Sequence, residues 1–75
     1  MKIDIHLTDT FGGEPNYSWV RRYSIEVPEQ ISDLAMMHRI KKVAGLNGVR
    51  CTVSRYGDSL ELRPEGRCMV LFANF

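Results

Sequence analysis

Two polar side chains near the start of the sequence are of the types that form acid–base pairs. Asp4 and His6 lie two residues apart in a stretch, 3–7, where apolar and polar residues alternate, so both would lie on one face of a strand. A carboxylate beside an imidazole can orient the ring. No activated nucleophile is recognisable nearby, and a solvated strand face explains the same pattern. We therefore expect no catalytic residues and no enzymatic activity.

The cysteines and glycines do not form a pattern that binds a metal or a phosphate. Cys51, Cys68 and the two histidines are scattered, without the close Cys or His pairs that zinc requires. The segment 11–16 (FGGEPN) has two glycines but lacks the Gly-x-x-x-x-Gly-Lys-Ser/Thr pattern, and no helix follows it. We expect a surface loop there, reduced thiols at both cysteines, and no metal or cofactor.

Basic residues cluster locally, although the chain as a whole is nearly neutral. Ten Lys and Arg residues against nine Asp and Glu residues give a formal net charge of +1, which excludes an acidic DNA mimic and a strongly basic nucleic-acid binder. The basic sets are Arg21 and Arg22 in a strand, and Arg39, Lys41 and Lys42 in a helix. A solvated surface explains them, and contact with an acidic protein surface or with phosphates remains an alternative.

The segment 17–23 (YSWVRRY) is rich in the residue types that dominate binding hot spots, which are Tyr, Trp and Arg. Exposed with apolar residues that have no assigned core position, it would form a patch of the kind that marks interfaces. Those apolar residues are Phe11, Met69, Leu71 and Phe75. A small core that needs its aromatic residues explains the pattern equally well. The residues predicted to bind a partner are Tyr17, Trp19, Arg21, Arg22, Arg39, Lys41 and Lys42.

The N-terminal two thirds of the chain predict two strands and one helix. The first strand follows the alternation at 3–7, a loop covers 9–17, and the second strand, Trp19–Val27, ends at Pro28. Ser32 has the type and position of a helix N-cap, and Gly45 can end the helix in the left-handed conformation, with Leu46 folding back toward Ile40. The helix therefore spans about 33–44. Its inward stripe is Met36, Met37, Ile40, Val43 and Ala44.

The C-terminal third predicts three strands joined by tight turns at 56–59 (YGDS) and 63–66 (RPEG). The expected pairs are Arg55 with Leu60, Val53 with Leu62, Leu62 with Cys68, and Leu60 with Val70. These registers give one core face, consisting of Val49, Cys51, Val53, Leu60, Leu62, Cys68, Val70 and Phe72. Met69 and Leu71 then face away, where the N-terminal hairpin or loop covers them unless they are exposed. Cys51 and Cys68 would lie roughly 9–10 Å apart, too far for an unstrained disulfide.

These elements predict a single domain, 1–75, with a two-layer α+β fold in the order ββαβββ. Its antiparallel sheet has four or five strands and one packed helix. A chain this short has marginal stability unless a partner helps it. The N-terminal segment is not of the targeting type, and the longest apolar run, Met69–Phe72, is far below the roughly 20 residues that span a bilayer. We expect a cytoplasmic protein.

The segments 9–22 (DTFGGEPNYSWVRR) and 44–51 (AGLNGVRC) resemble small uncharacterised proteins encoded by bacteriophages and other bacterial mobile elements. The resemblance implies a small cytoplasmic protein in a bacterial host cell. Compact proteins of this size and source are often inhibitors of host defence, anti-CRISPR proteins among them, and they typically act by binding a protein and blocking its function.

The resulting hypothesis is a non-enzymatic inhibitor that binds a host-defence protein complex, such as a CRISPR effector. The alternative is a small nucleic-acid-binding accessory protein that uses the basic helix face. Self-association as a homodimer is compatible with either hypothesis.

Overall fold

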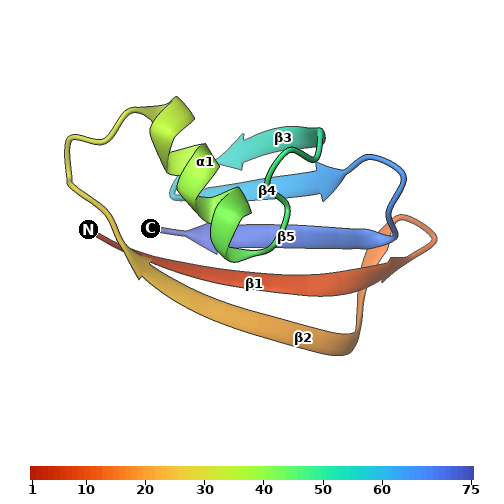
Figure 1. Cartoon of the computed structure of the whole chain (residues 1–75). Helices are drawn as coiled ribbons and strands as arrows, with labels where there is room; N and C mark the ends of the chain where they lie inside the picture. The colour runs from red at the N-terminus through yellow and green to blue at the C-terminus, as the bar shows by residue number, and fades with distance from the viewer.

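A computed structural model describes residues 1–75 and shows one helix packed on a five-stranded antiparallel sheet (Figure 1). In chain order the elements are β1 (Lys2–Phe11), β2 (Glu14–Glu26), α1 (Asp33–Val43), β3 (Cys51–Tyr56), β4 (Ser59–Pro64) and β5 (Met69–Asn74). The predicted α+β fold with the order ββαβββ is confirmed.

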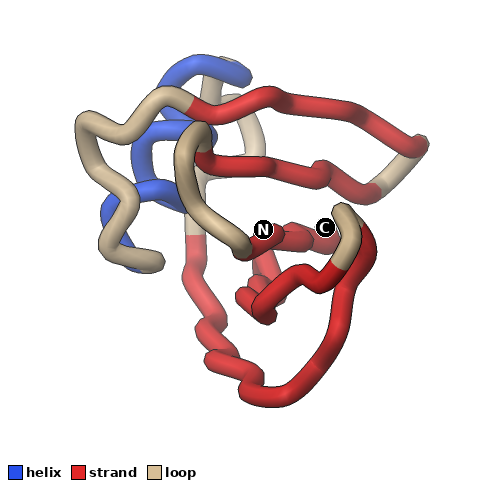
Figure 2. Tube along the Cα trace, turned by 90° about the vertical axis from the view of Figure 1, so that its right-hand side faces the viewer, coloured by secondary structure: helices blue, strands red, loops and turns tan.

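The spatial order of the strands, β2-β1-β5-β4-β3, pairs the first strand of the chain with the last. Because β2 and β3 form opposite edges, the segment between them must cross the sheet, and α1 lies in that crossing (Figure 1). Figure 2 shows the helix on one side of the strands, while no helix covers the other side. The sheet therefore has a helix face and an open face.

The N-terminal hairpin is longer than the sequence analysis predicted. Residues 9–17 do not form one loop, because β1 continues to Phe11 and β2 begins at Glu14. The turn consists of Gly12 and Gly13, with φ of 62° and 84°. Two consecutive positive φ values give a turn whose twist matches that of paired strands, and glycine adopts them without steric cost.

The helix boundaries agree with the prediction. The Ser32 hydroxyl accepts a hydrogen bond from the Ala35 N–H at 3.2 Å, as an N-cap does. At the other end, the N–H groups of Gly45 and Leu46 donate to the carbonyls of Lys42 and Lys41, which is a Schellman motif. One stripe residue was predicted wrongly: Val43 is 36% exposed, whereas its neighbour Ala44 is buried in the core.

The register between β3 and β4 is as predicted, but the register between β4 and β5 is not. Leu62 pairs with Leu71 and Leu60 with Ala73, so the inward residues of β5 are opposite to those expected. Residues 65–68 connect the two strands, so the link is longer than the tight turn the prediction assumed. Because β5 is apolar on both faces, its pattern could not reveal the error.

The corrected register changes the predicted positions of β5 residues and of the turn before it. Leu71 is fully buried on the helix face, and Met69 is half-buried beside the same core. Phe72 lies with His6 on the open face, and Cys68 is exposed in the turn before β5. The core lies between α1 and the central strands. It comprises Ile3, Ile5, Leu7, Val27, Met36, Ile40, Ala44, Leu46, Leu60, Leu62, Leu71 and Ala73.

No helix in the structure has the length and apolar character that crossing a membrane requires.

Candidate binding sites

A large bulge interrupts the pairing of β2 with β1. Thr8 pairs with Val20 and Thr10 with Pro15, so residues 16–19 of β2 lie opposite the single residue Asp9. A bulge bends its strand and directs side chains away from the regular pattern of the sheet. We call residues 16–19 the bulge.

Two side chains of β1 determine the shape of the bulge. The Thr8 side chain is buried; its hydroxyl donates to the Trp19 carbonyl at 3.0 Å and accepts from the Tyr17 N–H at 3.1 Å. The Asp9 carboxylate accepts from the Ser18 N–H and the Asn16 side-chain amide, both at 2.9 Å, and from the Ser18 hydroxyl. Polar groups that the strand ladder leaves unpaired in the bulge are thus hydrogen-bonded locally.

The same hydrogen bonds lower the pKa of the Asp9 carboxyl. Those from the Ser18 side chain, and next from the Asn16 side chain, hold the pKa of the Asp9 carboxyl well below its usual range. Hydrogen bonds to the charged form of a carboxyl group favour that form. The charged form of Asp9 is therefore favoured, and its oxygens accept the hydrogen bonds that shape the bulge.

The backbone of the bulge adopts an uncommon conformation. Tyr17 has a φ of 56°, and it is the only non-glycine residue of the chain with a positive φ. Such a conformation costs about 1–3 kcal/mol for a residue with a side chain, and it persists where surrounding contacts determine it. At Tyr17 those contacts are the hydrogen bonds of Thr8 and Asp9.

The hairpin end curls over the open face of the sheet. The Tyr17 ring lies 6.3 Å from the His6 ring, which itself stacks on Phe72 at 4.9 Å. The Arg63 guanidinium of β4 donates to the Gly13 carbonyl at 2.6 Å, although β5 lies between β4 and β1. This curl explains why Val70, on the open face of β5, is fully buried.

The bulge displays large side chains to solvent. Tyr17 is 55% exposed and Trp19 is 37% exposed. The Arg21 guanidinium carbon lies 5.4 Å from the centre of the Trp19 ring, within the range of a cation–π interaction. The two predicted residues Trp19 and Arg21 thus contact each other, whereas Arg22 lies on the opposite face beside His6.

The basic residues of the helix do not gather at the bulge. No hydrogen bond, ion pair or ring contact links Arg39, Lys41 or Lys42 with it. Arg39 and Lys42 are exposed, and Lys41 is half-buried in a separate hollow that Arg50 also lines. The seven predicted partner-binding residues therefore divide between the N-terminal hairpin and the helix.

Sequence reasoning missed the residues that shape the bulge, which are Thr8, Asp9, Asn16 and Ser18. The short polar side chains of Asp, Asn and Ser favour local hydrogen bonds to backbone groups, and that preference was the available signal. It does not specify that Asp9 would lie opposite four residues of the partner strand. The structure contains no group of three or more His, Cys, Asp or Glu residues that could hold a metal ion.

A comparison of the chain with protein-family models, curated proteins and solved structures finds no match. The functional argument therefore rests on the geometry of this molecule.

Proposed function

We propose that this protein binds another protein without catalysing a reaction, through a bulge surface composed of Tyr17, Ser18, Trp19 and Arg21. Tyr, Trp and Arg are the residue types enriched at the energetic centres of protein interfaces. Here all three types occur within five consecutive positions and are exposed or half-exposed.

The observation that carries the proposal is the fixed backbone of the bulge. Tyr17 keeps its positive φ because Thr8 and Asp9 hydrogen-bond the segment from Asn16 to Trp19. Binding by a mobile loop would lose about 1–2 kcal/mol for each backbone residue that becomes ordered. A segment ordered before binding avoids that loss, which is the general benefit of preorganisation.

The charge of the surface favours an acidic partner. Arg21 forms no salt bridge within the chain, so its guanidinium group is available to a carboxylate of a partner. The neighbouring carboxylate, Asp9, already accepts hydrogen bonds from Ser18 and Asn16. An acidic protein surface that docks on the bulge surface would therefore meet the Arg21 cation, while Arg22 lies on the opposite face of the sheet.

The proposed setting is the cytoplasm of a bacterial host cell, where the protein would inhibit a host-defence complex such as a CRISPR effector. The support is the resemblance to small proteins of phages and mobile elements over residues 9–22. That segment contains the bulge and both arginines. The bulge surface thus lies in one of the two segments, 9–22 and 44–51, that carry the resemblance.

The nucleic-acid alternative has weaker support. It requires the basic residues of the helix to converge with Arg50 and Arg55. Lys41 and Arg50 line one hollow, whereas Arg39, Lys42 and Arg55 do not line it. A homodimer is a further outcome, because the outer edge of β2 pairs with no other strand.

The test is affinity capture of a partner from bacterial lysate with the tagged protein, in high salt and after nuclease treatment. We compare the wild type with Trp19→Ala and with Tyr56→Ala, a control that removes an aromatic ring 63% exposed in the hairpin of β3 and β4. A hot-spot residue contributes about 2 kcal/mol or more, so Trp19→Ala should weaken binding by roughly thirtyfold.

Retention by the wild type and by Tyr56→Ala, with loss by Trp19→Ala, supports the proposal. Arg21→Glu should also abolish capture. Equal capture by wild type and Trp19→Ala contradicts the assigned surface, and a complex that disappears with nuclease favours nucleic acid instead.

A further inference from the structure

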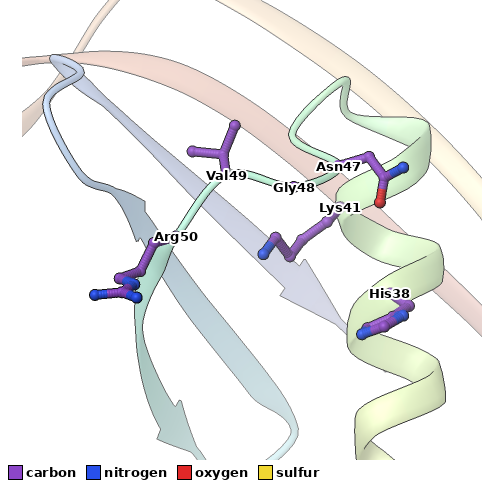
Figure 3. Close-up of a pocket in the computed structure, with 6 residues that line it drawn as sticks. All are labelled: His38, Lys41, Asn47, Gly48, Val49 and Arg50. Atoms are coloured by element: carbon purple, nitrogen blue, oxygen red, sulfur yellow. The ribbon is translucent and has the colours of Figure 1, made fainter.

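A second candidate site lies on the other side of the molecule, between α1 and the segment that leads into β3. It is a hollow of about 400 Å³. Figure 3 shows the Lys41 and His38 side chains extending from the helix toward this space. Arg50 lies across it, on the segment that leads into β3, with its guanidinium directed away from the helix. The complete lining is His38, Lys41, Asn47, Gly48, Val49 and Arg50.

The backbone around the hollow is well defined. After the Schellman motif at Gly45 and Leu46, the Val49 N–H donates to the Leu46 carbonyl at 3.0 Å and closes a turn. Gly48 takes a φ of 81° in that turn, as the third position of a type II turn requires. Leu46 is buried in the core, so it fixes the turn to the body of the domain.

The hollow carries positive charge without a matching negative charge. Lys41 and Arg50 form no ion pair and no side-chain hydrogen bond, and none of the lining residues is acidic. Burial raises the pKa of the adjacent Cys51 thiol, while the charges of Lys41 and Arg67 oppose that shift. Glu65 acts on the same thiol in the opposite sense to the two cations. Local positive charge therefore exceeds local negative charge.

The C-terminus of α1 lies beside the hollow, and its negative dipole end is largely compensated. Unpaired carbonyls at a helix C-terminus repel anions. Here the carbonyls of Ile40, Lys41 and Lys42 accept hydrogen bonds from Ala44, Leu46 and Gly45. Lys41 and Lys42 also add positive charge at this end.

We propose that this hollow binds the phosphate group of a phosphate monoester. Lys41 supplies a positive charge directed into the hollow. The unpaired Arg50 side chain on the opposite rim supplies a second when it turns inward to a bound dianion, and a planar guanidinium suits phosphate geometry. The His38 ring and the Asn47 amide supply further hydrogen-bond donors. Val49 is the only hydrophobic lining residue and no Tyr, Trp or Phe is present, so recognition is of the phosphate rather than of a stacked base.

This proposal does not depend on the protein-binding function of the bulge surface. Its test is a titration of the ¹⁵N-labelled protein with inorganic phosphate, adenosine 5′-monophosphate, and a short oligonucleotide with and without a 5′-phosphate. Binding should shift the amide signals of Gly48 and Val49. Lys41→Ala and Arg50→Ala should each weaken binding about tenfold, because each removes a charge-assisted hydrogen bond.

The matched control is Lys42→Ala, which removes the neighbouring lysine but not a lining residue. It should leave the dissociation constants within about twofold, as expected for a surface charge outside the site. Equal weakening by Lys42→Ala and Lys41→Ala, or no shift with any probe, overturns the proposal. Equal binding of both oligonucleotides also overturns it, because the site would then take backbone phosphodiesters instead of a terminal phosphate.

Discussion

At the scale of single residues, Asp9 accepts three hydrogen bonds from the bulge, although it is not itself one of the displayed residues. Asp9→Asn keeps the size of the side chain but removes the charge and part of the acceptor capacity that three hydrogen bonds use. We expect faster amide exchange at Ser18 and a changed Trp19 fluorescence spectrum. Asp58→Asn, in an exposed turn, is the control and should change neither. An unaltered bulge in Asp9→Asn would show that Thr8 alone is sufficient.

His6 makes stability depend on pH. Its burial between the Tyr17 and Phe72 rings, and then the Arg22 charge, lower the pKa of the His6 imidazole from its ordinary value of 6.5. Because the unfolded chain binds the proton more readily, stability is complete above pH 6.5 and falls as the pH decreases through 6.5 toward the lowered pKa.

The measurement is urea unfolding at a series of pH values. His6→Gln should abolish the decrease that occurs just below pH 6.5, whereas His38→Gln should retain it. If the stability of the wild type rises as the pH falls through this range, the predicted destabilising effect of His6 protonation is wrong.

At the scale of elements, the ends of α1 provide a quantitative check. Ser32→Ala removes the N-cap acceptor and should cost about 1 kcal/mol of unfolding free energy. Gly45→Ala places a side chain at a φ of 75°, and this strain should cost about 1 kcal/mol as well. Ser24→Ala, on an exposed strand position, is the control for denaturant unfolding. Costs near zero at both helix ends would contradict the assigned caps.

The helix ends and the turn between β3 and β4 could be predicted from single residues of the sequence. Ser32 and Gly45 marked the helix, and Gly57 marked the turn between β3 and β4, because each determines its structure through neighbouring backbone groups. The register of β5 could not be predicted from its pattern. Its neighbouring residues Val70 and Leu71 lie on opposite faces of the sheet, and both are fully buried. Only the curled hairpin end, which covers the open face, makes both burials possible.

The bulge surface could be predicted only in part, because residue types are visible in the sequence and strand pairing is not. Residue type alone identified Trp19 and Arg21, and the structure brings them together. The bulge itself depends on how β1 and β2 pair around Asp9, and that pairing is not encoded within any short segment. The hollow could not be predicted either. Helix periodicity places Lys41 near solvent, but it does not indicate that the turn at Gly48 brings Arg50 to the same hollow.

At the scale of the whole molecule, stability depends on a small core shared by both halves of the chain. Because β1 pairs with β5, the sheet is complete only when the two ends of the chain meet. Leu62 is fully buried on the helix face of β4, so Leu62→Ala should cost about 2–5 kcal/mol. That is a large fraction of the roughly 5–15 kcal/mol typical of a domain.

The control substitution is Leu34→Ala, which removes a helix side chain that is 71% exposed. It should change the unfolding free energy by less than about 0.5 kcal/mol. Thermal or denaturant unfolding measures both variants. A similar cost for the two leucines would contradict the position of the core.

The fixed conformation of the bulge is the central claim, and backbone ¹⁵N relaxation tests it most directly. Order parameters for the amides of Tyr17, Ser18 and Trp19 should be about 0.85, as in rigid backbone, and equal to those of β1. Values below about 0.6 would show a flexible loop. In that case the bulge would not be ordered before binding, and the main support for a preorganised binding surface would be lost.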